Sequence, residues 1–272
     1  MFNNPHFIST RYTKSLILLL ILFLVGSWYI RERNRYEQEG YLIVSSLDAD
    51  LVYQCQAAAK SYGLDWSLLV SFYLQTQPKA TTEEIMNQAA VIKESASEIR
   101  FFKSIFDEHE LKLMLYHARQ IKRFGYYFSP QYVFPVQSNQ LTYRNTWGAD
   151  RDSGKRKHQG TDIFAKQGTP IISITAGRIE KLGWNRLGGK RVGIRDIHGN
   201  YLYYAHLSDY RTDLNKGDSV LSGEIIGYMG DTGNAKGTPD HLHLGIMTHE
   251  GQWINPYHFL QYWSKYSKRN PE

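Results

Sequence analysis

The sequence predicts an α+β protein with three parts in order: an apolar N-terminal segment, a small all-helical segment and a mostly antiparallel β domain. Residues 15–30 are uncharged and strongly apolar. Between residues 48 and 125, apolar residues recur at three- and four-residue spacing, which is typical of helices that pack on one another. After Ser129-Pro130, short apolar runs alternate with glycine-rich turns, which is typical of an all-β domain.

These changes in composition predict the domain boundaries. We expect a cytoplasmic N-terminus over 1–14, a transmembrane anchor over 15–30, a charged stalk over 31–47, a helical domain over 48–128, a β domain over 130–262 and a basic tail over 263–272. The sharpest change lies near residue 130, where helical spacing gives way to turns. The chain has no internal repeat and no low-complexity tract.

Length, charge and cysteine content narrow the class of protein. A chain of 272 residues is long enough for one or two domains with a sizeable core. Its net charge of +6 favours an anionic environment, such as nucleic acid, a membrane surface or an acidic polymer. No nucleic-acid-binding module signature accompanies this charge, so we expect no nucleic-acid partner. Cys55 is the only cysteine, which excludes an intrachain disulfide and a four-cysteine zinc site.

Residues 15–30 are expected to form an uncleaved membrane anchor. As a helix they would rise roughly 24 Å at about 1.5 Å per residue, a little short of a hydrocarbon core of about 30 Å. Trp28 and Tyr29 would lie at the interface and help to cover the difference. A cleaved signal peptide is the alternative, with Val25-Gly-Ser27 as the only passable cleavage site. Basic residues flank both ends of the segment, so they do not set its orientation.

Capping residues predict where the helices of the second part begin and end. We expect helices over Asp48–Tyr62, from Asp65 to before Pro78, from the capping box Thr81–Glu84 to about Phe102, and over Asp107–Phe124. Gly63 and Gly125 are the expected C-terminal stops. The stretch 58–70 resembles the opening of lytic transglycosylase domains, but neutral Gln75 and Gln77 occupy the region where the catalytic glutamate is required. We therefore interpret this part as a spacer or docking module.

Alternating apolar residues bounded by turns predict the strands of the third part. We expect strands over Thr161–Ala165, Pro170–Thr175, Gly177–Trp184, Arg191–Ile197, Tyr201–His206, Glu224–Tyr228 and His241–Met247. His198-Gly-Asn200 is the expected hairpin turn between two of them. Because side chains alternate along a strand, the two histidines of His241-Leu-His243 are expected on the same face.

Histidine and carboxylate residues at three places in the β domain suggest a metal site. Neutral imidazole and carboxylate are usual ligands of zinc, and a catalytic zinc typically keeps three protein ligands. His158, Asp162 and one histidine of the 241/243 pair would supply those three. The other histidine of the pair and His206 would be left to accept a proton and to stabilise an oxyanion. These residues make the protein a candidate metal-dependent hydrolase.

The remaining histidines are interpreted as surface or structural residues: His6, His109, His117, His198, His249 and His258. His109-Glu110 begins like a helical zinc motif, but Leu113 stands where the second histidine of that motif is required.

The β domain resembles the lysostaphin-type (LytM-like) zinc endopeptidases of bacterial cell walls. The resemblance covers about Tyr132 to His258 and rests on His158-Gln-Gly-Thr-Asp162-Ile-Phe-Ala, Ala176-Gly-Arg, Tyr204-Ala-His206-Leu and Gly237-Thr-Pro-Asp-His241-Leu-His243. It implies that His158, Asp162 and His243 bind Zn²⁺. It further implies that His241 is the general base and that His206 orients or stabilises the tetrahedral intermediate. All five of these positions are retained in this sequence.

A narrower resemblance concerns the LytH-type branch found in spore-forming bacteria. It rests on Asn145-Thr-Trp-Gly148 and on the stretch from Gly183 to Asp196. It implies a role in sporulation and cleavage between L-alanine and D-glutamate of the stem peptide; a cross-link peptide is the other substrate that the family would allow.

The resemblance implies a zinc metalloendopeptidase whose partner is peptidoglycan, and the apolar segment 15–30 adds the cytoplasmic membrane as an expected partner. Since this substrate lies outside the membrane, the C-terminal domain is expected there too, with the chain passing the cell membrane once. The alternative is a non-catalytic LytM-like domain that binds the wall or a partner and regulates another cell-wall hydrolase. The retained ligand and base positions argue against that alternative.

Overall fold

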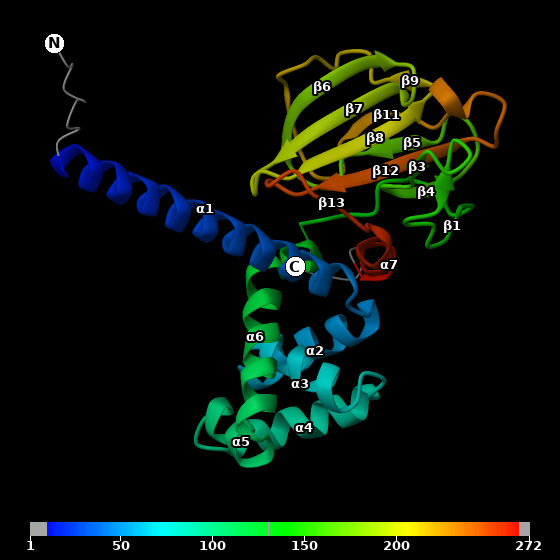
Figure 1. Ribbon diagram of the computed structural model, residues 1–272. Helices are drawn as coiled ribbons and strands as arrows, with labels where there is room; N and C mark the ends of the chain where they lie inside the picture. The colour runs from blue at the N-terminus through cyan, green and yellow to red at the C-terminus, as the bar shows by residue number, and fades with distance from the viewer. Residues whose placement is uncertain (1–9, 130, 267–272) are drawn as a thin grey trace, which may run out of the picture. The chain divides into compact units, whose positions relative to one another are not determined.

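The computed structural model describes residues 10–129 and 131–266, with side chains from residue 19 onward (Figure 1). The chain divides into two compact units between Glu39 and Gly40. A long helix, α1 (Thr10–Ser45), runs through the predicted anchor and most of the predicted stalk. Within the part of the chain that the structure describes, no helix has the length and apolar character needed to cross a membrane. The predicted anchor begins at residues 15–18, whose side chains lie outside the described ones.

The segment predicted as a charged stalk is helical, and its end belongs to the second unit. Ion pairs one helical turn apart join Arg33 to Glu37 (3.3 Å) and Arg35 to Glu32 (2.6 Å). Such pairs support helical structure in a charged stretch. Val44 and Leu47 are buried in the core of the second unit, so that unit begins earlier than residue 48.

The helices of the second unit begin at the predicted capping residues. They are α2 (Ala49–Tyr62), α3 (Trp66–Thr76), α4 (Thr82–Glu94), α5 (Glu98–Ile105) and α6 (Glu108–Phe124). Asp48, Asp65, Thr81 and Asp107 each accept hydrogen bonds from backbone amides of the first turn. Gly63 ends α2 in the left-handed conformation that favours glycine, with φ +68°.

One predicted helix end was wrong, and another was confirmed with a different cap conformation. The helix expected from Thr81 to Phe102 is broken between α4 and α5, because Ser95 is extended and Ser97 caps the new helix at Arg100. Gly125 follows α6 without a left-handed conformation, and the chain continues into the short 3₁₀ helix η1 (Gly125–Phe128). Glycine is needed here for close packing, since a Cβ would lie 2.7 Å from Trp66 Cη2.

The third part is built of antiparallel strands, as predicted. The strands are β1 (Thr142–Tyr143), β2 (Asp150–Arg151), β3 (Arg156–Lys157), β4 (Thr161–Phe164), β5 (Pro170–Ile172), β6 (Gly177–Asn185), β7 (Gly189–Asp196), β8 (Tyr201–Leu207), β9 (Asp209–Tyr210), β10 (Ser219–Val220), β11 (Ile225–Tyr228), β12 (His241–Met247) and β13 (Trp253–Ile254).

One large sheet has the strand order β1-β4-β12-β8-β7-β6-β10, with β13 paired to β12 (Figure 1). A smaller sheet has the order β5-β11-β9, and β2 and β3 form a separate hairpin. The large and small sheets bury their apolar residues in one core, which includes Ile163, Leu202 and Ile226. The central strands of the large sheet, β4, β12 and β8, carry most of the predicted site residues.

The predicted basic tail is wrong in its first part, because residues 257–266 form a helix, α7 (Tyr257–Tyr266). Phe259 and Trp263 are fully buried. The Trp263 indole donates to the Tyr127 carbonyl (2.7 Å), and the Phe259 ring stacks on the Tyr127 ring with centroids 4.6 Å apart. The helical part and the β domain therefore share a core. Lys268 and Arg269 of the predicted tail lie outside the described residues.

Replacing Trp263 with alanine is expected to destabilise both parts together, because its ring packs on Tyr132 and Phe259 as well as on η1. A fully buried tryptophan of this kind contributes about 3–5 kcal/mol. Chemical denaturation followed by circular dichroism measures the loss. The matched control is Trp184→Ala, since Trp184 is 65% exposed and its loss should cost less than about 0.5 kcal/mol. Equal effects of the two changes would contradict the shared core.

Candidate metal centre

The pairing of β4 with β12 brings two of the predicted ligands together. In this antiparallel register His243 stands opposite Asp162, and His241 stands opposite Phe164. Residues directly opposite each other point to the same face of the sheet. Asp162 and His243 therefore meet on one face, and His241 follows two residues away on the same face. On its other side, β12 pairs with β8, where Ala205 stands opposite His243.

His158 reaches the same face from the segment before β4. Two backbone hydrogen bonds hold this segment: His158 N–H donates to the Ala149 carbonyl (2.8 Å), and Gly148 N–H donates to the His158 carbonyl (2.9 Å). The imidazole Nδ1 lies 3.0 Å from the Thr146 carbonyl. A proton on Nδ1 would be donated there, which leaves the Nε2 lone pair free to bind a metal.

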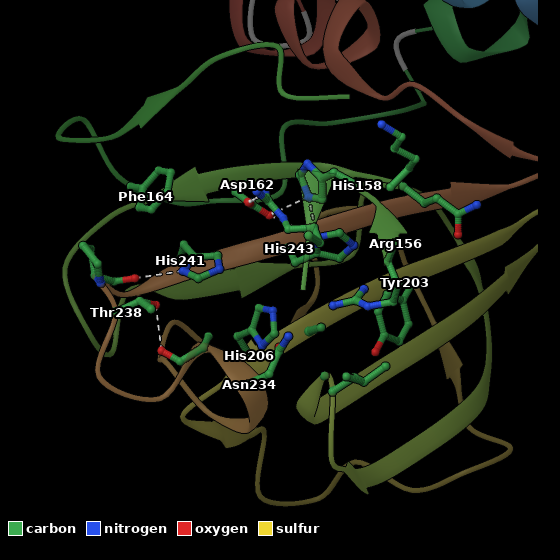
Figure 2. Close-up of a pocket in the computed structure, with 18 of the residues that line it drawn as sticks. Arg156, His158, Asp162, Phe164, Tyr203, His206, Asn234, Thr238, His241 and His243 are labelled. Atoms are coloured by element: carbon green, nitrogen blue, oxygen red, sulfur yellow. Dashed lines mark hydrogen bonds and ion pairs between the residues drawn. The ribbon is translucent and has the colours of Figure 1, made fainter. Parts of the chain in front are cut away.

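The potential ligand atoms form a nearly equilateral triangle (Figure 2). His158 Nε2, His243 Nδ1 and Asp162 Oδ1 each lie 3.0 Å from the other two. In a tetrahedral zinc site with bonds of about 2.0–2.1 Å, neighbouring ligand atoms are about 3.3 Å apart. Two imidazole nitrogens and one carboxylate oxygen are also a donor set that suits zinc. The residues present therefore fit a catalytic metal ion that keeps one position open.

The carboxylate of Asp162 has partners on both oxygens. Its Oδ2 accepts a hydrogen bond from Arg151 Nη2 at 2.6 Å, while Oδ1 faces the two histidines. Burial alone would raise the pKa of Asp162, but hydrogen bonds from His158 and His243 hold it well below its usual range. The carboxylate is thus ionised, as a metal ligand must be. Because Arg151 binds Oδ2 of Asp162, only Oδ1 of this carboxylate is directed at the two ligand histidines.

Gly160 makes room for the His243 ring. A Cβ on Gly160 would lie 2.5 Å from His243 Cε1, 2.7 Å from His243 Nε2 and 2.5 Å from the Leu244 carbonyl oxygen. Contacts this short do not occur between real side chains, so a larger residue here must displace β12 or the ring. Glycine at position 160 is therefore part of the ligand arrangement, although it offers no ligand atom itself.

The other two predicted histidines face the same cavity. His206 Nδ1 lies 2.8 Å from the Thr232 carbonyl, and His241 Nδ1 lies 2.8 Å from the Pro239 carbonyl. Protons on these Nδ1 atoms would be donated to the carbonyls, so both Nε2 atoms are left as acceptors. The two ring centroids are 4.9 Å apart. Burial lowers the pKa of His206 to about 4, which keeps it neutral near pH 7.

Backbone conformation and hydrogen bonds fix the position of His206. Its φ is +67°, a left-handed conformation that is uncommon outside glycine. Its N–H donates to the Gly188 carbonyl (2.8 Å), which ties it to the turn between β6 and β7. The Thr232 hydroxyl accepts from Lys190 N–H (2.9 Å) and donates to the Leu207 carbonyl (2.7 Å), so the segments around His206 are joined.

These side chains line a cavity of about 580 Å³ that is open to solvent. Figure 2 shows His158, Asp162 and His243 in its middle, His241 and Thr238 on one side, and Arg156 and Tyr203 on the other. The five predicted site residues thus meet in one place.

The histidines interpreted as structural, where described, lie outside the lining of this cavity. His198 stacks on Tyr126 with centroids 3.9 Å apart, and His249 Nδ1 lies 3.1 Å from Tyr41 Oη. His6 lies outside the described residues.

Sequence reasoning did not identify Thr146, Arg151, Gly160 and Thr232 as supporting residues. Two of them had a signal: Thr146 lies in the stretch Asn145–Gly148, and Gly160 lies between His158 and Asp162. Arg151 and Thr232 had no local signal, since their contacts depend on how the hairpin and the loop before β12 fold.

The domain that holds this site is similar to known proteins. Residues 156–256 match the model of peptidase family M23. The L-Ala–D-Glu endopeptidase of Bacillus subtilis is 40% identical over 155 residues, which cover 53% of this chain and 48% of that protein. Lysostaphin of Staphylococcus simulans is 39% identical over 92 residues, which cover 33% of this chain and 18% of lysostaphin. The chain thus spans less than half of the length of either relative.

A solved structure extends the likeness to the helical part. The putative glycyl-glycine endopeptidase LytM of Ruminococcus gnavus superposes with a TM-score of 0.55 at 25% identity. The superposition covers 82% of this chain and 90% of that one. Because the matched M23 residues are a smaller share of the chain, the superposition extends beyond them.

Proposed function

We propose that the protein, whose residues 156–256 match the model of peptidase family M23, is a zinc-dependent endopeptidase that hydrolyses peptide bonds of bacterial peptidoglycan. The observation that carries the proposal is the triangle of ligand atoms, each 3.0 Å from the others, beside two histidines with free Nε2 atoms. A non-catalytic regulator would have no need to keep all of these residues in one solvent-open cavity.

His158 Nε2, Asp162 Oδ1 and His243 Nδ1 would hold the zinc ion. When bound, zinc supplies a Lewis acid that lowers the pKa of water to about 7. His241 is placed to act as general base, because its Nδ1 is engaged by the Pro239 carbonyl and its Nε2 can accept a proton. Neutral His206 is oriented in the same way by the Thr232 carbonyl, which leaves its Nε2 as an acceptor; it would orient the tetrahedral intermediate by accepting a hydrogen bond from a hydroxyl of that intermediate.

The bond between L-alanine and D-glutamate of the stem peptide is the proposed point of cleavage. The relative named for this bond is 40% identical to this chain over 155 residues, a longer match than that to lysostaphin. The narrower resemblance of Asn145–Gly148 and of the stretch from Gly183 to Asp196 supports the same choice.

Membrane attachment through α1 is part of the proposal. The large apolar residues of α1 from Leu19 to Ile30 are mostly exposed, and Phe23 is 69% exposed. An exposed apolar surface of this extent calls for an apolar partner. We propose that residues 15–30 anchor the chain in the cytoplasmic membrane and that residues 40–272 act outside it, where peptidoglycan lies.

The proposal is tested by incubating the full chain and zinc with purified peptidoglycan and identifying the products by mass spectrometry. We expect fragments with a new amino terminus on D-glutamate, and we expect a chelator to stop their release. The full chain is required because α7 and η1 join the β domain to the helical part. No release in the presence of zinc would refute the enzymatic function and favour the regulatory alternative. New termini on another residue would refute only the choice of bond.

A further inference from the structure

Two arginine side chains lie on one face of the hairpin that precedes the metal ligands. β2 pairs antiparallel with β3, so that Arg151 stands opposite Arg156. Directly opposite residues point to the same face, with Cβ atoms about 4.5–5.5 Å apart, and like charges there are destabilising. Both side chains line the cavity of the metal centre. Two positive charges therefore stand opposite each other at the edge of this cavity, each with a carboxylate partner.

The two guanidinium groups have different partners. Arg151 donates to Asp162 Oδ2 at 2.6 Å and so belongs to the ligand group. Arg156 binds Asp152 through Nε at 2.5 Å. Its terminal Nη atoms have no hydrogen-bond partner among the residues that the structure describes, and its side chain is 39% exposed. Arg156 can therefore present these donors to a ligand in the cavity.

Basic residues outnumber acidic residues in the lining of the cavity, although Arg156 and Lys157 also pair with Asp152 and Asp150 of the same hairpin. Arg151, Arg156 and Lys157 line it, and the only carboxylate among its described lining residues is that of Asp162. That carboxylate already bonds to Arg151 and to the two ligand histidines. Figure 2 shows Arg156 on the side of the ligand group away from His241. A substrate with a negative group on that side of the scissile bond would be complementary to the cavity.

We propose that Arg156 binds a free carboxylate of the substrate beside the bond that is cut. This inference rests on the proposed function. In an L-alanine–D-glutamate bond, the glutamate α-carbon carries both the scissile nitrogen and the α-carboxylate. That carboxylate is free because the stem peptide continues through the glutamate side chain. Arg151 contacts the ligand Asp162 and stands opposite Arg156 in the hairpin. Only the Arg151 side chain therefore separates Arg156 from the three ligand residues. Its planar fork of donors matches a carboxylate.

The test compares two stem peptides that differ in one group: D-glutamate with its α-carboxylate, and the same residue with an α-carboxamide. The full-length protein with zinc is expected to cleave the acid with a kcat/KM about tenfold higher than the amide, as expected for one charge-assisted hydrogen bond in a partly exposed site. Arg156→Gln should lower kcat/KM for the acid about tenfold and change that for the amide less than about twofold. The preference for the acid would then disappear.

Two further variants separate recognition from folding. Arg156→Lys keeps the positive charge but loses the fork, so it should retain part of the preference. Lys155→Gln removes an exposed positive charge from the same turn, at a position that does not line the cavity, and should keep the preference unchanged. Zinc content is measured for each variant, because a change in metal content would act on both substrates alike.

The outcomes distinguish this inference from the function on which it rests. If the full-length protein cleaves neither peptide, the proposed function fails. If it cleaves both with equal kcat/KM, or if Arg156→Gln lowers both by the same factor, the function stands and the role of Arg156 is refuted. A loss of preference in Lys155→Gln as large as in Arg156→Gln would also refute a specific site and indicate long-range attraction alone.

Discussion

His243→Ala is expected to empty the metal site, whereas His241→Ala is expected to retain the metal and lose most turnover. His243 Nδ1 belongs to the triangle of ligand atoms, so its loss leaves only two protein ligands. His241 points into the cavity from beyond that triangle, with its Nδ1 engaged by the Pro239 carbonyl. Removal of a general base lowers kcat by about 10²–10⁴.

Metal content by atomic absorption and kcat on peptidoglycan fragments measure these two effects separately. The control is His109→Ala, because His109 is an exposed residue of α6 and its loss should change neither quantity. If His241→Ala also emptied the site, the roles within the pair would be reversed. If His241→Ala bound zinc and kept full turnover, His206 would have to be the base.

Gly160→Ala is expected to lose metal binding almost completely, although glycine offers no ligand atom. The new methyl group would lie 2.5 Å from both His243 Cε1 and the Leu244 carbonyl oxygen. The carbonyl cannot move without shifting β12, and the ring cannot move without leaving its ligand position. Well-packed interiors respond to such overpacking with backbone shifts that cost about 1–3 kcal/mol. A shift of β12 carries His243 away from His158 and Asp162. Zinc titration measured by calorimetry would detect the loss as a fall in affinity.

The matched control for Gly160→Ala is Gly168→Ala. Gly168 has a φ of +79°, and nothing lies within 4 Å of the position of its Cβ. Alanine there introduces backbone strain but no clash, so the protein should lose some stability and keep its zinc affinity. Normal zinc affinity in Gly160→Ala would show that the contact with His243 does not hold the ligand in place.

The helical part shows how far local signals reach. Asp48, Asp65 and Asp107 were predicted as the starts of helices, Asp65 as a cap, and each accepts backbone hydrogen bonds in the structure. A cap acts within one turn, so its residues suffice to recognise it. The break between α4 and α5 was missed because apolar residues continue at helical spacing across it. Ser95 and Ser97 were the available signal, since serine favours positions at helix ends.

The strands of the β domain were predicted where they are long and alternate clearly. β12 has the predicted bounds, His241–Met247, while two-residue strands such as β2 and β3 were not recognised. A two-residue strand has no periodicity, and its existence depends on the partner to which it pairs. Helix α7 was missed for a different reason: its buried residues pack on η1, a contact that joins distant parts of the chain.

Motifs in the sequence predicted five residues for one site, because ligand chemistry depends on residue type. The structure brings His158, Asp162, His206, His241 and His243 to one cavity. Which atom of each residue faces the metal position required the fold. His158 presents Nε2 and His243 presents Nδ1, because different backbone segments lie beside the two rings.

Residue types and short-range spacing thus predicted the fold class, the helix starts and the candidate site residues. Each of these features depends on residues that lie within a few positions of one another. The arrangement of the site residues around the cavity depends instead on pairing between segments that are distant in sequence. The register of β4 with β12 places Asp162 opposite His243, and the β2–β3 hairpin brings Arg151 to Asp162 and Arg156 to the cavity edge. Such contacts arise only when segments distant in sequence pack together, because the free energy of that packing belongs to the whole core rather than to any one segment.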